Sequence, residues 1–537
     1  MTITIPDYMP ALIVAVPLLG AFLTPLISKI NGKIRNGFVI FILLVNTALV
    51  FLLSYDVITN GIRTYIFGSS QEVTLPIVRI LFEVDAMSVF MGIIISILVL
   101  ISVIYSWAFM EKNTGLDKYY TLILLLTAGM LGMVSTGDMF NFFVFLEITS
   151  IASCALIAFW THHAESIEAG FKYIVISSIG ALFVLFSIAL LYGQYDALNI
   201  AILSDAIQYT FLDKVALVLL VVALAMKAGI VPMHMWLPDS YGKAPSTISV
   251  ILVSATLASL YGVLRVIFTL YGNVLDVVTR DIEFLNIKVM TGQWLGWLII
   301  LLAIASILVG VIMALRQTDF KRLIAFAAVA EIGYMFLGVG VRLASVFVEN
   351  GNGLTVVHPG FGDTALQGSV FHIMNDALDV GLLFLVAGAI YYATRELSLD
   401  KLGGLARNMK YTTIFFLIGL LAVSGMPPLN GFASKLIIYE TTFQLNPILG
   451  IIAILCSILL LATFVKVFHS IFLGPPLPQY KEVKEVPKSM LLAMGVIAGL
   501  IIFIGLFPEI IYTNIVQPAA DALINYSSYI TTVVGGI

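Results

Sequence analysis

The chain has 537 residues, of which 60% are hydrophobic and only 11% are charged, with a formal net charge of −4 and a mean hydropathy of +1.06. Soluble domains carry about a quarter charged residues, and a globule this apolar would expose large apolar surfaces to water. The composition excludes a disordered chain, a disulfide scaffold and a nucleic-acid-binding protein. We therefore expect a polytopic membrane protein.

Apolar segments recur along the chain, each long enough to cross a hydrocarbon core of about 30 Å as a helix. A helix satisfies its backbone polar groups within one segment, and the alternation typical of a membrane β-barrel is missing. We predict an all-α polytopic membrane protein with about 14 transmembrane helices. The predicted spans are 10–28, 38–54, 84–109, 119–136, 139–160, 167–192, 214–236, 244–271, 294–315, 322–342, 365–393, 411–443, 446–472 and 490–514.

Lysine and arginine residues predict the orientation of these spans. Sixteen lie in loops that follow odd-numbered spans, and six lie in the opposite loops. Because cytoplasmic loops are enriched in Lys and Arg, the odd-numbered loops should face the cytoplasm. Both termini are then expected outside the cell membrane.

The remaining five basic residues lie within predicted spans. Arg265 and Lys466 lie close enough to helix ends to extend to the interface, and Lys172 lies further in. Lys227 and Lys435 lie near the middle of their spans. A central lysine costs about 2.5–3.5 kcal/mol on insertion, so such a residue indicates a functional site.

Three acids also lie in mid-span, namely Glu147, Glu331 and Asp379. A single such residue is equally well explained as a polar group that holds helices together. Together with the three deeper lysines, however, these acids make six ionisable groups within predicted spans, and both signs of charge are present. This set favours an ion pathway across the membrane.

Proline residues adjoin two of the lysines. Pro232 follows Lys227 in the seventh span, and Pro427 and Pro428 precede Lys435 in the twelfth. Proline removes a backbone donor and disturbs the preceding turn, so spans 7 and 12 should be discontinuous. Interrupted helices in corresponding places of two halves indicate the ion site of a transporter.

Spans 4–8 and 9–13 form two candidate units of five helices, and the odd number makes one unit inverted relative to the other. The placement of charge supports this pairing, although similarity of sequence between the units is weak. The corresponding residues are Glu147 and Glu331 in the second helices, Lys172 against His372, Asp376 and Asp379 in the third, and Lys227 and Lys435 in the fourth.

These units suggest a division of the chain into four parts. Residues 1–118 contain spans 1–3 and an external loop, 119–271 the first five-helix repeat, and 272–472 the second. Residues 473–537 contain a cytoplasmic linker and the last span.

Five motifs lie in order along the chain, namely GDMFNFFVFLEITSIASCALI (137–157), KAGIVPMHMWLPDSYGKAPSTIS (227–249), DFKRLIAF (319–326), HIMNDALDVGLLFLVAG (372–388) and SGMPPLNGFASK (424–435). With these motifs the chain resembles the antiporter-like subunits of respiratory complex I and the Mrp cation/proton antiporters. The resemblance is closest to the D-type subunit of the Mrp antiporters and its homologue in archaeal membrane-bound hydrogenase-type complexes, and it covers essentially the whole chain. It implies a 14-helix fold with two inverted five-helix repeats and a proton-conducting polar axis at mid-membrane.

The resemblance also implies roles for individual residues. Glu147 matches the family's glutamate of span 5, Lys227 its lysine of span 7, and Lys435 its ionisable residue of span 12. Lys172 resembles the lysine through which protons are taken up at span 6.

Three positions depart from the family pattern. Leu257 stands where span 8 carries a lysine or histidine, and Val380 stands where span 11 carries a lysine. Glu331 stands where relatives more often have a small, polar or histidine residue. Because histidine titrates near neutral pH, His372 could replace the missing lysine, with Asp379 on the same helix face.

We therefore predict a proton-translocating subunit of a larger membrane complex, with sodium antiport left open. The predicted relay comprises Glu147, Lys227, Lys172, Lys435, His372, Asp379 and Glu331. Its partners would be protons, lipid and other membrane subunits of an Mrp-type, hydrogenase-like or complex I-type assembly, in the cell membrane. No cofactor, metal or redox chemistry is expected on the chain itself. Alternatives are a membrane component of a complex I-type quinone oxidoreductase, a stand-alone secondary transporter and an autonomous membrane enzyme.

Overall fold

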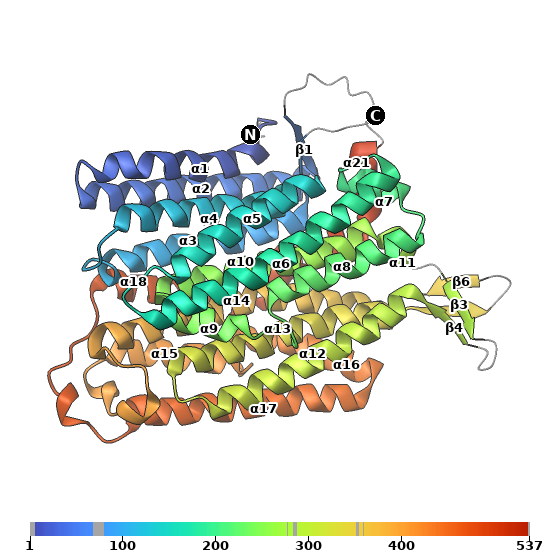
Figure 1. The fold of residues 1–537 in the computed structure, drawn as a ribbon. Coiled ribbons are helices and arrows are strands. Elements are labelled where there is room, and N and C mark those ends of the chain that lie inside the picture. The colour runs from blue at the N-terminus through green and yellow to red at the C-terminus, as the bar shows by residue number, and fades with distance from the viewer. Residues whose placement is uncertain are drawn as a thin grey trace.

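The computed structural model describes residues 6–67, 80–275, 278–282, 287–350, 354–357 and 359–534. Long helices lie side by side along a common direction, with α1 and α2 at one edge of the bundle and α17 at the other (Figure 1). Both marked termini lie at the same end of these helices (Figure 1). We call this the terminal end, and the other the linker end.

Three helices and a hairpin precede the first predicted unit. α1 (Met9–Ser28) and α2 (Gly32–Asn60) are joined by a short turn, and α3 (Ala86–Phe109) follows the hairpin. The antiparallel strands β1 (Arg63–Ile66) and β2 (Leu81–Val84) lie in the segment where the sequence predicts an external loop with short strands.

The first unit contains five long helical segments, the fourth of which is interrupted. The loop between the third and fourth segments carries a short helix. The elements are α4 (Leu116–Ser135), α5 (Met139–Ile157), α6 (Ala164–Tyr195), α7 (Ile200–Ala206), α8 (Phe211–Ala228), α9 (Trp236–Lys243), α10 (Ser246–Leu264), the π-helix η1 (Arg265–Leu270) and α11 (Gly272–Leu275).

The second predicted unit contains five long helical segments, the fourth of which is interrupted, and two antiparallel hairpins lie in its loops at the terminal end. Its helices are α12 (Thr291–Arg316), α13 (Phe320–Ala344), α14 (Gly360–Thr394), η2 (Leu399–Lys401), η3 (Leu405–Arg407), α15 (Lys410–Val423), α16 (Asn430–Leu445) and α17 (Pro447–Phe468). The hairpin strands are β3 (Val278–Ile282), β4 (Ile287–Met290), β5 (Phe347–Asn350) and β6 (Leu354–Val357).

The C-terminal part departs from the prediction of a single span over 490–514. α18 ends at Leu506, and the chain then forms short helices that pack on α3, α14 and α7. Pro508 follows this end, where its ring cannot continue the helix. The elements are η4 (His469–Leu473), η5 (Pro478–Tyr480), α18 (Lys488–Leu506), α19 (Pro508–Ile511), η6 (Tyr512–Val516), α20 (Gln517–Ile524) and α21 (Tyr526–Val534).

Twelve helices in the described part of the chain are long and apolar enough to cross a membrane. The interrupted segments α8–α9 and α15–α16 lie outside this number. The all-α polytopic membrane fold is thus confirmed, whereas the total of fourteen spans stays a prediction.

The two units resemble each other in their local details. Asp138 accepts a hydrogen bond from the backbone N–H of Asn141 at the start of α5, and Asp319 accepts one from that of Arg322 at the start of α13. Such caps satisfy donors that a helix leaves free at its N-terminus. The inverted relation of the units and the four-part division of the chain stay predictions.

The units meet where α10 packs against α14 and α9 packs against α13. α10, α13 and α14 are buried over the whole of their apolar windows. Polar side chains on these helices are therefore shielded from lipid by the rest of the chain.

Candidate functional site

The first interruption separates α8 from α9 directly after Lys227. α8 ends at Ala228, and Gly229 adopts a positive φ of 80°, a conformation that favours glycine. The backbone N–H of Val231 donates to Ser306 Oγ on α12 at 2.9 Å, and Trp236 Nε1 donates to the carbonyl of Met226 at 3.0 Å. The groups freed by the break thus find partners within the protein, as a non-aqueous environment requires.

Lys227 is buried, with 6% of its surface exposed, and its Nζ donates to Ser150 Oγ at 2.5 Å. Glu147 lies one turn before Ser150 on α5. In the described part of the chain, Glu147 and Lys227 form no ion pair within 4 Å, and Glu147 Oε1 is buried without a hydrogen-bond partner. Among described residues, the predicted Glu147–Lys227 pair is therefore open in this structure.

A small cavity adjoins the lysine. Its volume of about 10 Å³ is close to the minimum that holds one water molecule. Thr149, Thr256 and Ser259 contribute polar lining from α5 and α10. A water here would have the polar partners that a buried water needs.

The second interruption separates α15 from α16 before Lys435. α15 ends at Val423, and Gly425 adopts a positive φ of 72°. A Cβ at Gly425 would lie 3.0 Å from Lys435 Cδ, so glycine also leaves room for the lysine side chain. The backbone carbonyl of Ser424 accepts a hydrogen bond from Ser457 Oγ on α17 at 3.1 Å.

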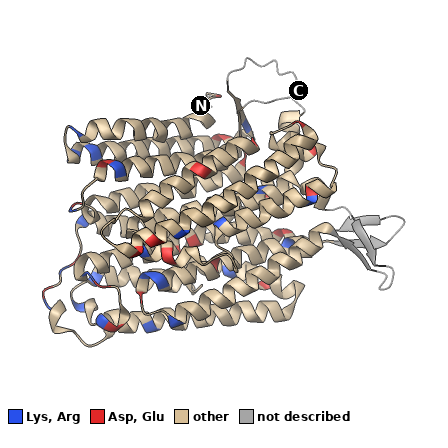
Figure 2. Ribbon diagram, in the orientation of Figure 1, with Lys and Arg blue, Asp and Glu red and all other residues tan. Residues whose placement is uncertain are grey.

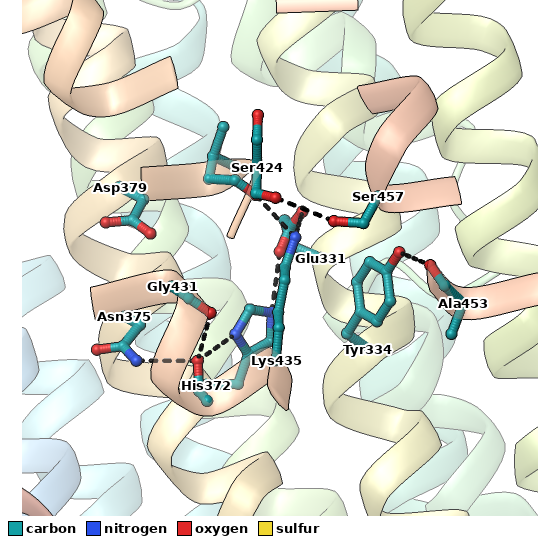
Figure 3. Close-up of polar contacts among 12 residues, drawn as sticks. Glu331, Tyr334, His372, Asn375, Asp379, Ser424, Gly431, Lys435, Ala453 and Ser457 are labelled. Carbon is teal, nitrogen blue, oxygen red and sulfur yellow. Dashed lines mark hydrogen bonds and ion pairs between the residues drawn. The ribbon is translucent and has the colours of Figure 1, made fainter. Parts of the chain in front are cut away.

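Lys435, Glu331 and His372 form a fully buried cluster drawn from α16, α13 and α14 (Figure 3). Lys435 Nζ lies 2.8 Å from Glu331 Oε1 and donates to the carbonyl of Val423 at 2.7 Å. His372 Nε2 lies 2.9 Å from Glu331 Oε2. We call these three residues the Glu331 cluster.

Lys227 and Lys435 share one property despite these different partners. Lys227 lies in the last turn of α8, and Lys435 reaches back to Val423 at the last turn of α15. The C-terminal end of a helix carries partial negative charge, which favours a nearby cation. Each break therefore supplies a helix end that stabilises an ammonium group inside the membrane.

Polar contacts extend the Glu331 cluster along α14. His372 Nδ1 lies 3.1 Å from Ser434 Oγ, which also accepts from Asn375 Nδ2 at 2.9 Å. Asn430 Nδ2 donates to Asn375 Oδ1 at 3.3 Å and to Asp379 Oδ1 at 3.0 Å. Figure 3 labels Asn375 and Asp379 beside the Glu331 cluster. The structure thus brings four predicted relay residues, namely Glu331, His372, Asp379 and Lys435, into one buried network.

Asp376 is a neighbour that the sequence placed on the same helix face. Its side chain is buried, and its Oδ1 has no hydrogen-bond partner in the described part of the chain.

Tyr241 on α9 contacts Thr256 of α10 through its hydroxyl and packs on Phe384 of α14. Leu257 and Val380, two of the three positions at which the sequence departs from the expected pattern, are buried apolar residues on α10 and α14.

Lys172 lies elsewhere, and its prediction as a deep residue is wrong. Its side chain is 45% exposed and forms ion pairs with Glu168 at 2.8 Å and Asp239 at 2.9 Å. Arg322 also contacts Asp239, at 3.1 Å. The lysine lies in a charged cluster with a cavity of about 250 Å³, not in the buried network.

Two further basic residues differ from expectation. Arg265 does not extend to the interface; it is 5% exposed and holds both carboxylate oxygens of Asp85, at 2.7 and 2.8 Å. Lys321, which the sequence places in a loop, is buried on α13, and its Nζ donates to the carbonyl of Ala244. No feature of the local sequence indicates these partners, although Lys321 lies in the motif DFKRLIAF.

The fold and these sites define a multi-pass membrane protein in which two interrupted helices each place a lysine in a buried polar site. The chain matches the family described as NADH:quinone oxidoreductase/Mrp antiporter, TM, over residues 136–349 and 352–461. The N-type subunit of NADH-quinone oxidoreductase from Desulforudis audaxviator is 30% identical, over 95% of this chain and 98% of that protein. The chain therefore belongs to the NADH:quinone oxidoreductase/Mrp antiporter transmembrane family.

Two longer proteins are also similar. The A-type subunit of the Na⁺/H⁺ antiporter from Alkalihalophilus pseudofirmus is 29% identical over 95% of this chain, and hydrogenase-4 component B from Escherichia coli is 30% identical over 79%. The aligned part spans only 62% of each of these two relatives.

Solved structures share the fold over nearly the whole chain. A chain of the archaeal membrane-bound sulfane sulfur reductase superposes with a TM-score of 0.83 at 26% identity, covering 98% of this chain and 99% of that one. A chain of the Mrp complex from Dietzia gives 0.82 at 23% identity, with the same coverage. Respiratory complex I from Thermus thermophilus gives 0.78 at 18% identity, covering 96% and 99%.

Proposed function

We propose that this chain moves protons across the membrane as one subunit of a larger membrane complex. The observation that carries the proposal is the Glu331 cluster, in which a lysine, a carboxylate and a histidine lie in hydrogen-bond contact without solvent exposure. Burying ionisable groups is costly, and in membrane proteins such groups mark ion pathways and proton relays. The membership of the family supports the same function.

The geometry supports a simple exchange in the second unit. Lys435 can give a proton to Glu331 across 2.8 Å, which converts an ion pair into a neutral amine and a carboxylic acid. Once the carboxyl group has turned so that the proton is carried on Oε2, Glu331 can give it across 2.9 Å to His372 Nε2 in the tautomer that holds its proton on Nδ1, which contacts Ser434. Each step stays within hydrogen-bond distance, as proton transfer requires.

In the first unit, Lys227 and Glu147 would form the corresponding switchable pair. A buried lysine holds its proton less tightly, and an adjacent carboxylate strengthens that hold. The contact with Ser150 and the cavity beside it support an arrangement in which the lysine has left the carboxylate. Lys172, in its exposed charged cluster, would supply protons from the linker end.

We also propose that the linker end faces the cytoplasm and that both termini lie outside, in the cell membrane. Lys and Arg residues are more frequent along the linker end in Figure 2, as the distribution in cytoplasmic loops predicts. Partner subunits would be those of an Mrp-type, hydrogenase-like or complex I-like assembly. Reporter fusions to both termini would test the orientation.

Proton flux into everted membrane vesicles that contain the complete complex tests the function. We expect Lys435→Met and Lys227→Met each to lower proton flux by about a hundredfold, the contribution of one well-placed proton-transfer group. Lys466→Met is the matched control, because Lys466 lies in α17 but its side chain is exposed. Undiminished flux in both buried-lysine variants would refute the proposal, and sodium uptake measured in parallel shows whether sodium moves as well.

A further inference from the structure

A second buried carboxylate site lies at the terminal end of the bundle, away from the predicted relay. Glu83, on β2, is fully buried, and neither of its carboxylate oxygens has a hydrogen-bond partner among the described residues. The carboxylate lies against the turn between α4 and α5, since a Cβ at Gly137 would be 3.1 Å from Glu83 Oε2. The turn therefore leaves no space for a side chain between itself and the carboxylate.

Arg265 is the adjacent cation, but it does not neutralise Glu83, because its guanidinium group is already paired with Asp85. Arg265 NH1 and NH2 donate to the two oxygens of Asp85 at 2.8 and 2.7 Å. Asp85 also caps α3 by accepting from the backbone N–H of Ser88 at 2.9 Å. One arginine thus balances one of two buried carboxylates, and among the described residues Glu83 forms no ion pair.

Two tyrosines lie at this site, Tyr529 beside Glu83 and Tyr261 beside Arg265. Tyr529 of α21 lies next to Glu83, with a buried hydroxyl that has no hydrogen-bond partner among the described residues, and its ring centroid is 4.7 Å from Arg265 Cζ. Tyr261 on α10 donates to the carbonyl of Val134 and contacts Arg265. Among the described residues, the charged and titratable groups at this site are therefore Asp85, Arg265, Tyr261 and Tyr529.

Protonation accounts for this arrangement. Burial raises the pKa of Glu83 well above its ordinary value; the charge of Arg265 opposes this rise and that of Asp85 adds to it. The pKa of Asp85 is instead lowered, because the charge and hydrogen bonds of Arg265 outweigh the effect of burial. Two carboxylates two residues apart thus differ in state, a pattern typical of proton-transfer sites.

The same helix connects Glu83 to the first relay site. α10 contributes Thr256 and Ser259 to the cavity beside Lys227. Arg265 follows Ser259 by six residues, about 9 Å along a helix, in the direction of the terminal end. At Arg265 the helix changes to the π-helical η1, a feature frequent at functional sites.

We propose that Glu83 is the proton-release site of the first unit, receiving protons from the Lys227 site along α10 and passing them out beside Tyr529 at the terminal end. The Arg265–Asp85 pair holds the two sides of this site together. This inference rests on the proposed function, and it adds an outlet in the first unit that is separate from the Glu331 cluster.

Infrared difference spectra of the purified complex between acidic and alkaline pH test the protonation of Glu83 without any transport. We expect the carboxylic-acid band to contain a component that disappears at alkaline pH and is missing from the spectrum of Glu83→Gln, while the components from other buried acids remain. Glu509→Gln is the control, because Glu509 is an exposed acid on α19 and its loss should leave that component unchanged. A difference spectrum that is identical in Glu83→Gln and the unmodified protein would overturn the inference.

Proton flux then separates this inference from the proposed function. We expect Glu83→Gln to lower flux by about a hundredfold, with partial recovery in Glu83→Asp. Tyr529→Phe keeps the ring on Arg265 but removes the hydroxyl, and it should shift the Glu83 band and slow flux less than Glu83→Gln. If Lys227→Met abolishes flux while Glu83→Gln leaves it intact, the outlet is wrong and the function stands; if neither changes flux, the function fails as well.

Discussion

Lys227 and Lys435 lie at corresponding interrupted helices, but their surroundings differ. Lys435 forms an ion pair with Glu331 and a hydrogen bond to a free helix carbonyl. Among the described residues, the Lys227 ammonium group forms a hydrogen bond only with the hydroxyl of Ser150. Its expected partner Glu147 has a buried carboxylate oxygen without a hydrogen bond. A switchable pair requires one closed and one open arrangement, and the two units show one each.

The difference arises from the side of the break on which each lysine lies. Lys227 precedes its break and projects from α8, whereas Lys435 follows its break and reaches back across it to α15. This second placement brings the ammonium within reach of α13, where Glu331 Oε1 lies 2.8 Å from Lys435 Nζ. Glu331 thus supplies the carboxylate of the closed pair.

Breaking the closed pair should have the largest effect on stability. Lys435→Met leaves Glu331 buried without its cation, which should lower the free energy of unfolding by about 3–5 kcal/mol. The double variant Glu331→Gln with Lys435→Met removes both charges and should recover most of this loss, yet proton flux should remain absent. Chemical unfolding in detergent measures both, and a double variant as unstable as the single one would contradict the ion-pair interpretation.

Asp138, at the start of the helix that carries Glu147 and Ser150, should give the next largest effect. Burial raises the pKa of Asp138 from 3.8 to about 6, despite hydrogen bonds from the backbone N–H groups of Asn141 and Phe140. As pH rises between these values the unfolded chain loses the proton first, so stability should fall by up to about 3 kcal/mol and stay low above pH 6.

Asp138→Asn should abolish this fall, because asparagine caps a helix about as well as aspartate. The gain should be absent below pH 4 and complete above pH 6, as measured by unfolding midpoints across this range. Asp319→Asn is the matched control: Asp319 caps α13 in the same way, but 33% of its side chain is exposed. Equal gains in both variants would show that burial is not the cause.

Replacing the lysine of the open site, Lys227, should have the opposite effect on stability to replacing Lys435 in the closed site. Lys227→Met removes a buried charge that has no ion pair within 4 Å among the described residues, so the free energy of unfolding should change by no more than about 1 kcal/mol or rise. Proton flux should nevertheless be lost. A loss of stability as large as that of Lys435→Met would show that the first unit also holds a closed pair.

The hydrogen bond from Lys227 to Ser150 should have the smallest effect. Ser150→Ala removes the hydroxyl that holds the ammonium away from Glu147, so we expect a several-fold decrease in flux and a change in stability of about 1 kcal/mol. Ser96→Ala is the control, because the buried Ser96 hydroxyl bonds only to the backbone of its own helix. Identical flux in the two variants would remove Ser150 from the relay.

Much of the architecture follows from the sequence. Long apolar segments predict membrane helices because lipid cannot satisfy backbone groups, and Pro232, Pro427 and Pro428 predict the two breaks that the structure contains. The buried positions of Lys227, Lys435, Glu331, His372 and Asp379 follow from their place in mid-span. Each of these features depends on residues that lie close together in the sequence, so one segment of the chain is enough to predict it.

The pairing of charges was not predictable in the same way. The sequence places Arg265 near a helix end and Lys172 further into its span, yet Arg265 is buried against Asp85 and Lys172 is exposed beside Asp239. Their partners lie 180 and 67 residues away, so only the packing of distant helices determines which residue is shielded.

The composition alone determined that this protein spans a membrane, because a chain in which only 11% of the residues are charged cannot cover the surface of a soluble globule of this size. The positions of the few charges in mid-span indicated where protons would pass. Tertiary structure decided which charges meet: Glu331 with Lys435 and His372, and Asp85 with Arg265, while Glu83 has no ion pair among the described residues. A charge inside the membrane is stabilised or left titratable by whichever side chain the fold places within a few ångströms, and that distance is a property of the packed helices.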